Sequence, residues 1–148
     1  MPVDAGEAAA CGQLVLVGEA AGAVQQADVL GIRREAFDIY NYRAERLAPK
    51  LEEYLSTGRI AAILYSNPNN PSWMCLTEDE LRTIGELANK YEAVVIEDLA
   101  YLTMDFRKDV NPQTGLPTQV SVTPWAKDYI LMMSASKIFS YAGERIAV

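Results

Sequence analysis

A lysine among small hydroxyl residues lies near the end of the chain and could bond covalently to an aldehyde. Lys137 follows Ser134 and Ser136, and Arg145 stands eight positions after it. A lysine amine condenses with a carbonyl group when a protein site holds both in place. A guanidinium and two hydroxyls form a suitable set of ligands for a phosphate. Because a single lysine is more often a solvated surface charge, the assignment depends on the residues that would surround it.

Three apolar segments upstream of the lysine each lead into polar side chains. The segments 60–66, 93–98 and 129–133 have the length and composition of buried strands. The polar residues at or after their ends are Asn70, Asp98, Tyr101, Ser134 and Lys137. Ligands of open α/β sheets bind beyond the carboxyl ends of the strands. We therefore expect the three ends to converge on one ligand.

These side chains match the polar parts of pyridoxal phosphate, an aldehyde cofactor that acts as an electron sink. Lys137 would bind its aldehyde, and Asp98 would keep its pyridine nitrogen protonated through a charge-assisted hydrogen bond. Tyr101 and Asn70 would donate hydrogen bonds to the ring oxygen. The phosphate would be bound by Ser134, Ser136 and Arg145.

The order of these motifs resembles that of the fold-type I pyridoxal-phosphate enzymes, in particular the class I and II aminotransferases. The matching elements are Asn70-Pro71, Asp98 to Tyr101, Ser134 to Lys137, and Arg145. The resemblance covers residues 31–148 and is poor over residues 1–30. It implies that the chain is a fragment of the large cofactor-binding domain, without the small C-terminal domain.

The resemblance also implies roles and partners. Lys137 would be the catalytic residue, which forms the Schiff base and moves a proton between the substrate α-carbon and the cofactor. The parent enzyme would transfer an amino group from an amino acid to a 2-oxo acid and would work as a homodimer. A pyridoxal-phosphate-dependent β-lyase or synthase of the same fold, and a non-catalytic cofactor-binding remnant, remain alternatives.

One position departs from the family pattern, which usually has glycine where this chain has Trp73. Glycine enters positive φ freely and tryptophan does not, so we expect the turn to differ locally. The indole could wall a substrate pocket, and core packing explains it equally well.

The other candidates have ordinary structural alternatives too. Asp98 could be a capping or loop acid, and Tyr101 could pack its ring at the domain surface. Asn70 belongs to a run of turn-forming residues. Arg145 could form an exposed ion pair with Glu144. All of these alternatives would have to hold together to remove the site.

Alternating strand and helix patterns predict an α/β fold, with a mostly parallel sheet and helices on both faces. Leu47, Leu51 and Leu55 give the segment 43–55 one apolar helical face, and Gly58 would end that helix. A capping box at residues 77–80 predicts the start of a second helix, over about 78–91. Two further strands are expected at residues 14–17 and from about residue 32.

The composition is typical of a soluble cytoplasmic enzyme. The net charge of −7 disfavours nucleic acid as a partner. The chain has no histidine and two cysteines, which excludes the usual zinc sites, so no metal is expected. Gln13 and Glu19 interrupt the apolar stretch near the amino terminus, which is therefore not expected to span a membrane. The first residues also lack the positive charge of a signal peptide.

Overall fold

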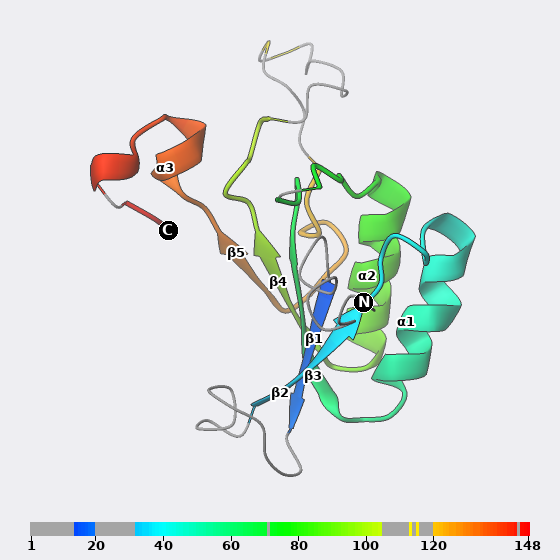
Figure 1. The fold of residues 1–148 in the computed structure, drawn as a ribbon. Helices are drawn as coiled ribbons and strands as arrows, with labels where there is room; N and C mark the ends of the chain where they lie inside the picture. The colour runs from blue at the N-terminus through cyan, green and yellow to red at the C-terminus, as the bar shows by residue number, and fades with distance from the viewer. Residues whose placement is uncertain are drawn as a thin grey trace, which may run out of the picture.

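A computed structural model describes residues 14–19, 32–70, 72–104, 113, 115, 120–144 and 146–148. Its five-stranded sheet has the strand order β2-β1-β3-β4-β5 (Figure 1). The strands are β1 (Leu14–Glu19), β2 (Ile32–Phe37), β3 (Ile60–Ser66), β4 (Val94–Asp98) and β5 (Tyr129–Met132). All five lie at or near the segments that the sequence predicts.

The pairing of the strands separates the sheet into two parts. β3, β4 and β5 run parallel to one another, whereas β1 runs antiparallel to both of its neighbours, β2 and β3. The predicted α/β class is confirmed. The parallel character holds for the three strands whose ends carry the candidate residues.

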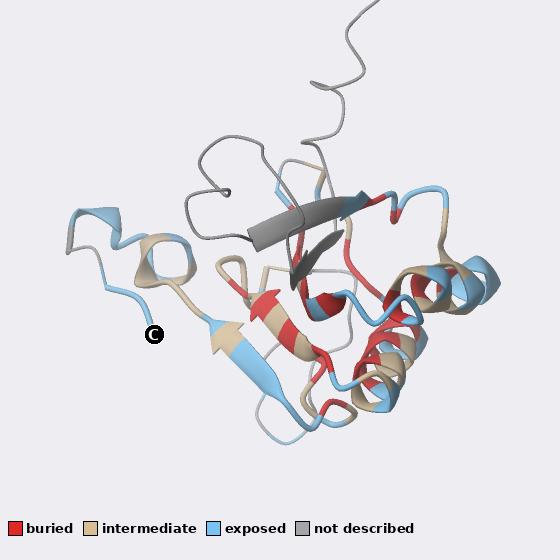
Figure 2. Cartoon of the chain, turned by 90° about the horizontal axis from the view of Figure 1, so that it is seen from below, coloured by how far each residue is buried: buried red, intermediate tan, exposed pale blue. Residues whose placement is uncertain are grey.

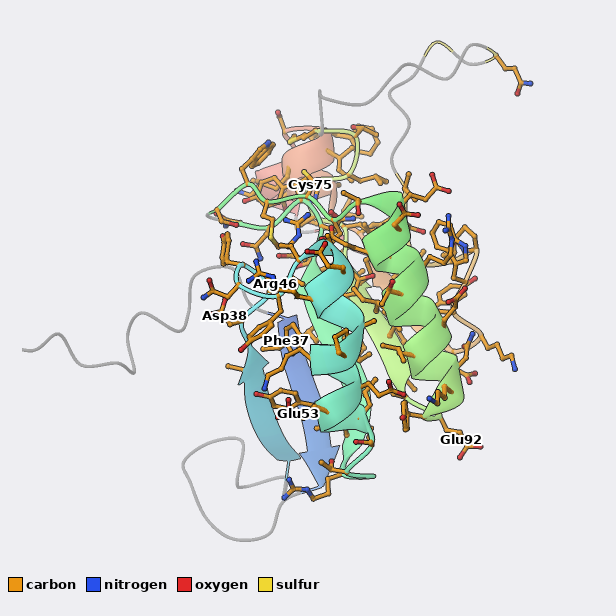
Figure 3. The ribbon with its side chains drawn as sticks, turned by 90° about the vertical axis from the view of Figure 1, so that its right-hand side faces the viewer. Phe37, Asp38, Arg46, Glu53, Cys75 and Glu92 are labelled. Atoms are coloured by element: carbon orange, nitrogen blue, oxygen red, sulfur yellow. The ribbon has the colours of Figure 1, made fainter. Side chains whose placement is uncertain are left out.

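Two helices, α1 (Leu47–Leu55) and α2 (Glu78–Lys90), pack against each other and cover one face of the sheet (Figures 1 and 3). The predicted apolar face of α1 is confirmed, since Leu47, Leu51 and Leu55 are all buried. A third helix, α3 (Ala135–Ile138), lies beyond the end of β5 rather than on a face of the sheet (Figure 1). Within the described residues, the long helices therefore occupy a single face, where the sequence led us to expect helices on both. Short 3₁₀ turns at Ala44–Arg46 and Ala142–Glu144 complete the helical elements.

The core lies between this helical layer and the central strands. Ile63 of β3 and Val95 of β4 are buried against Leu51, Leu81 and Ile84 of the helices. Figure 2 shows the buried residues gathered there, while β5 and the segment after it are mostly exposed. Burying an apolar side chain of this size stabilises the fold by about 1.5–3 kcal/mol. The packed layer thus provides the stable base from which the strand ends project.

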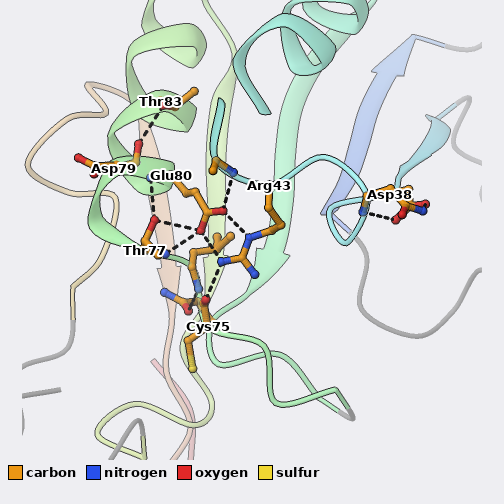
Figure 4. A network of polar contacts seen from close by, with 11 residues as sticks. Asp38, Arg43, Cys75, Thr77, Asp79, Glu80 and Thr83 are labelled. Atoms are coloured by element: carbon orange, nitrogen blue, oxygen red, sulfur yellow. Dashed lines mark hydrogen bonds and ion pairs between the residues drawn. The ribbon is translucent and has the colours of Figure 1, made fainter. Parts of the chain in front are cut away.

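A polar network fixes the start of α2 and is drawn in Figure 4. The Thr77 hydroxyl accepts a hydrogen bond from the Glu80 N–H (3.2 Å), and the Glu80 carboxylate accepts one from the Thr77 N–H (2.9 Å), which confirms the predicted capping box. Arg43 forms an ion pair with Glu80 and also donates to the Cys75 carbonyl oxygen (3.2 Å). Burial opposes ionisation of Glu80, but hydrogen bonds from Arg43, Thr77 and Ala44 lower its pKa to about 2. The network ties the residues before α1 to the end of the loop that follows β3.

None of the helices in the described part of the chain is long and apolar enough to cross a membrane.

Candidate functional site

The ends of the three parallel strands lie side by side in one row. The register pairs Ser66 of β3 with Asp98 of β4, and Asp98 with Met132 of β5. The hydrogen bonding continues one residue further, because the Asn67 N–H donates to the Asp98 carbonyl oxygen (3.0 Å) and the Leu99 N–H donates to the Met132 carbonyl oxygen (2.8 Å). The three strand ends therefore lie beside one another at one edge of the sheet.

Asp98 is a half-buried acid at the carboxyl end of β4. Its Oδ1 accepts a hydrogen bond from the Ala100 N–H (2.9 Å), which shapes the turn after the strand. Among the described residues no donor reaches its second carboxylate oxygen. Asp98 therefore has a local structural role and still retains an oxygen that can accept a hydrogen bond from a ligand.

Tyr101 and Lys137, from separate segments, are brought together beyond the sheet. The Lys137 Nζ lies 6.0 Å from the centroid of the Tyr101 ring, at the outer limit of a cation–π contact. Tyr101 is half-buried and Lys137 is exposed near the end of α3. The phenol and the amine can thus act on the same ligand.

Ser134 and Ser136 lie at the start of α3. The Ser134 hydroxyl accepts a hydrogen bond from the Ser136 N–H (3.3 Å) and caps this four-residue helix. Because it acts there as an acceptor, it can still donate its own proton to a phosphate. Asn70 is exposed in the turn after β3 and makes no hydrogen bond to Asp98, Tyr101 or the other described candidates. Arg145 and Pro71 lie outside the described residues.

The turn after β3 contains Trp73 in the left-handed backbone region, with φ +56°. Tryptophan thus occupies the backbone region that glycine enters freely. The Trp73 N–H donates to the Asn69 carbonyl oxygen (2.8 Å), and the Asn69 N–H donates to the Met74 carbonyl oxygen (2.8 Å), so the turn is held from both sides. The indole is 44% exposed, which excludes core packing, and its ring centroid lies 5.5 Å from that of Tyr101.

A second acid, for which the sequence suggested no role, immediately precedes Asp98 in β4. Glu97 is fully buried, and its carboxylate accepts a hydrogen bond from the Val122 N–H (3.1 Å). Its other oxygen accepts a longer bond from the Asn67 side-chain amide (3.4 Å), whose own oxygen accepts from the Leu76 N–H (3.1 Å). Burial raises the pKa of Glu97, and these hydrogen bonds offset the effect only in part.

Glu97 therefore connects the loop after β3 to the segment before β5. Burial and the nearby Glu97 carboxylate also raise the pKa of Tyr65 well above its usual range. The signal in the sequence was an acid at the end of an apolar run, immediately before Asp98.

An apolar cavity of about 610 Å³ lies next to these residues, between the turn after β4, α3 and the C-terminal residues. Its walls include Leu102, Met133, Ile138, Phe139 and Val148. Asp98, Tyr101 and Lys137 do not line it. Of the described candidate residues only Ser134 lines the cavity, so we place the candidate site at the strand ends instead.

A family model described as aminotransferase class I and II matches residues 28–148. The chain belongs to this family. Pyridoxal phosphate is the cofactor with which these aminotransferases work, so the predicted cofactor is that of the family.

Similar proteins carry several names. The chain is 32% identical to histidinol-phosphate aminotransferase 3 of Burkholderia lata over 107 residues, which are 70% of the chain and 26% of that relative. It is 31% identical to a putative cystathionine beta-lyase of Mycobacterium tuberculosis over 93 residues, which are 63% of the chain and 21% of the relative.

Among solved structures, N-succinyldiaminopimelate aminotransferase of Mycobacterium tuberculosis matches with 29% identity and a TM-score of 0.51. The match covers 68% of this chain and 24% of that one. The chain thus spans about a quarter of the length of the relatives that it matches.

Proposed function

We propose that residues 31–148 form part of the cofactor-binding large domain of a pyridoxal-phosphate-dependent aminotransferase. The observation that carries this proposal is the approach of Lys137 to Tyr101 at the edge of the sheet where Asp98 ends β4. Together with the acid and the two serine hydroxyls nearby in the sequence pattern, this amine and phenol would form a donor set that fits the polar groups of the cofactor. When bound, pyridoxal phosphate supplies an electron sink for charge that develops at the substrate α-carbon.

Each of the candidate residues in this chain would have a separate role in binding the cofactor or moving the proton. Lys137 would bond to the aldehyde through Nζ and would also take the proton from the substrate α-carbon. Asp98 would accept a hydrogen bond from the pyridine nitrogen and stabilise the proton there by charge. Tyr101 would donate from its hydroxyl to the ring oxygen. Ser134, whose hydroxyl caps α3, would donate to the phosphate.

The remaining assignments follow the sequence pattern. Asn70 would assist Tyr101 at the ring oxygen, and Ser136 and Arg145 would complete the phosphate site. The substrates of the parent enzyme would be an amino acid and a 2-oxo acid. We also infer that this parent is a cytoplasmic homodimer, as the resemblance implies.

A β-lyase or synthase with the same cofactor site is a second candidate. It is supported by the 31% identity to a putative cystathionine beta-lyase. Both reactions begin with loss of the α-proton to the same lysine, so the residues described here serve either one. The fate of the substrate separates them, because a lyase releases pyruvate and ammonia without an acceptor 2-oxo acid.

A non-catalytic cofactor-binding role is a third candidate. It is supported by the small share of the relatives that the chain spans, between 21% and 26% of the curated ones named above. In that case the chain would bind the cofactor through Lys137 and form neither product.

The deciding experiment is an absorbance titration with pyridoxal phosphate. We expect a visible band that survives dialysis and becomes irreversible on borohydride reduction, with the modified peptide containing Lys137. Lys137→Ala should lose this band. Lys127→Ala is the matched control, since Lys127 is also exposed but lies in the segment before β5, and it should keep the band. Equal bands in the two variants would refute the proposal.

Assays of the products then separate the three candidates. Formation of 2-oxo acids that depends on an added acceptor indicates transamination, and release of ammonia without one indicates a lyase. Asp98→Asn should still bind the aldehyde but lose most α-proton chemistry, because a neutral pyridine is a poor electron sink. Unchanged turnover in that variant would contradict the role of Asp98.

A further inference from the structure

We propose that Trp73 is a specificity-determining residue, which makes the site prefer amino acids with aromatic or large apolar side chains. This inference rests on the proposed function, because it concerns the substrate that reacts beside Lys137. It begins with the position at which this chain departs from the family pattern.

The backbone at Trp73 has the conformation that glycine adopts at no cost. With φ +56°, it lies in a region that L-residues other than glycine, asparagine and aspartate rarely occupy. The loop is nevertheless tightly bonded, because the Ser72 hydroxyl donates to the Asn69 side-chain oxygen (2.8 Å) and the Asn69 side-chain amide donates to the Ser66 hydroxyl (3.0 Å). These hydrogen bonds hold the turn in place although the backbone of Trp73 is strained. The difference between Trp73 and the usual glycine is therefore the indole side chain.

The indole lies against a candidate cofactor residue. Its ring meets the Tyr101 ring edge to face, with an interplanar angle of 70° and 5.5 Å between centroids. On the same phenol ring, the Lys137 Nζ lies 6.0 Å from the centroid. Trp73, Tyr101 and Lys137 thus form one cluster, and the exposed part of the indole is free to contact a substrate held near the lysine.

The chemistry of this cluster favours an apolar side chain on the substrate. An aromatic ring would pack against the indole and gain an aromatic pair contact in addition to buried area. In the part of the chain that the structure describes, Lys137 is the cation that contacts these rings. Two described arginines are engaged elsewhere, Arg43 with Glu80 and Arg82 with Asp79. Among the described residues, no arginine contacts Trp73 or Tyr101 to act as counter-ion for an acidic substrate side chain.

The test uses the cofactor-loaded chain and three amino acids. L-phenylalanine, L-alanine and L-aspartate are titrated against the Lys137-dependent absorption band, and their apparent dissociation constants are compared. We expect the order phenylalanine, alanine, aspartate from tightest to weakest. In Trp73→Gly the preference for phenylalanine over alanine should fall about two- to tenfold, the value of one aromatic contact. Trp73→Phe should restore most of it.

The melting temperature of the unloaded chain separates specificity from a merely structural role. Trp73→Gly removes the positive-φ strain and also the contact with Tyr101, so we expect a melting temperature close to that of the parent chain despite the loss of preference. A residue kept only for stability would show the reverse pattern.

A fluorescence measurement tests the contact without turnover. The chain has two tryptophans, and Trp125 packs against Gly85 and Arg82 of α2, away from the cluster. In Trp125→Phe, 4-nitro-L-phenylalanine should quench the single remaining tryptophan as it binds to the loaded chain. In Trp73→Phe, where Trp125 remains, the quenching should be weaker.

The results of these experiments distinguish a failure of the Trp73 inference from a failure of the proposed function. Absence of a Lys137-dependent band refutes the function, and the inference with it. A normal band with the same preference in the parent chain and in Trp73→Gly refutes the inference alone. So does a normal band that no amino acid alters, or equal quenching of the two tryptophans.

Discussion

The helical layer with β3 and β4 differs sharply from β5 and α3 in how well its side chains are packed. Ile84 of α2 is completely buried, whereas Ile130 of β5 is 52% exposed (Figure 2). The candidate residues lie where these two regions meet, with Asp98 on the packed side and Lys137 on the exposed side. The acid is thus held by a rigid base, and the lysine is supported by few buried contacts.

This difference predicts that the residues that stabilise the fold and those proposed to bind the cofactor lie largely in separate regions. Substitutions in the packed layer should unfold the protein, whereas substitutions around β5 and α3 should change ligand binding with little effect on unfolding. The following predictions test this contrast, beginning with the largest effect.

The largest contrast is between two isoleucines. Ile84→Ala should lower the free energy of unfolding by about 2–5 kcal/mol, because it leaves a cavity in the core. Ile130→Ala should cost less than about 1 kcal/mol, since half of that side chain already contacts water. Urea unfolding monitored by circular dichroism measures both. Similar costs for the two variants would mean that β5 is packed as firmly as the helical layer.

The second prediction concerns the ion pair between Arg43 and Glu80, which anchors the loop after β3. Arg43→Met should cost about 2–4 kcal/mol at neutral pH, because it leaves the buried Glu80 carboxylate without its charge partner. The matched control is Arg59→Met, since Arg59 is exposed and forms no ion pair in the described part of the chain. It should change the free energy of unfolding by less than about 0.5 kcal/mol.

The same pair gives the protein a defined acid response. The pKa of Glu80 is lowered from 4.5 to about 2, so the folded state favours its ionised form. This contribution to stability is present above pH 4.5 and is lost as the pH falls towards 2. Arg43→Met should reduce the loss of stability over that range. An unchanged acid response would show that other carboxylates control it.

The sequence was informative wherever the determining contacts are local. The four-residue spacing of Leu47, Leu51 and Leu55 specifies a buried helix face, and Thr77 with Glu80 specifies a helix start within one turn. Both features depend on neighbours along the chain, so a single sequence is sufficient to read them.

Contacts between segments that are distant in the sequence cannot be predicted from such local patterns. Arg43 and Glu80 are 37 positions apart, and no local pattern relates them. In the sequence, Glu97 is simply an acid at the end of an apolar strand. Only the fold shows that Asn67 and Val122 donate hydrogen bonds to it. The candidate site is a mixed case, since the motif order indicated its residues, but only the fold shows that both Lys137 and Trp73 lie close to the Tyr101 ring.

The third prediction addresses Glu97, at the boundary between the two regions. Its pKa is raised, so the folded state favours the protonated acid. This contribution to stability is complete below its usual value of 4.5 and is lost as the pH rises through the folded pKa.

Glu97→Gln, which cannot ionise, should therefore lose less stability than the parent chain as the pH rises above 4.5. Urea unfolding at a series of pH values measures this difference. Glu86→Gln, an exposed change on α2, is the control and should follow the parent chain. A steeper decline in Glu97→Gln would mean that the ionised carboxylate, with its bonds from Val122 and Asn67, is the more stable form in the fold.

The smallest expected effect on stability is at Trp73, where two opposing contributions nearly cancel. Removing the indole loses an aromatic contact with Tyr101 worth about 0.5–1.5 kcal/mol. Both Trp73→Ala and Trp73→Gly lose this contact, but only glycine adopts φ +56° without strain. Trp73→Gly should therefore be more stable than Trp73→Ala by about 1–2 kcal/mol, and its free energy of unfolding should lie within about 1 kcal/mol of the parent value. Equal stability of the alanine and glycine variants would show that the turn relaxes out of the left-handed conformation. In that case the backbone would not hold the indole rigidly beside Tyr101, and this placement could not explain substrate specificity.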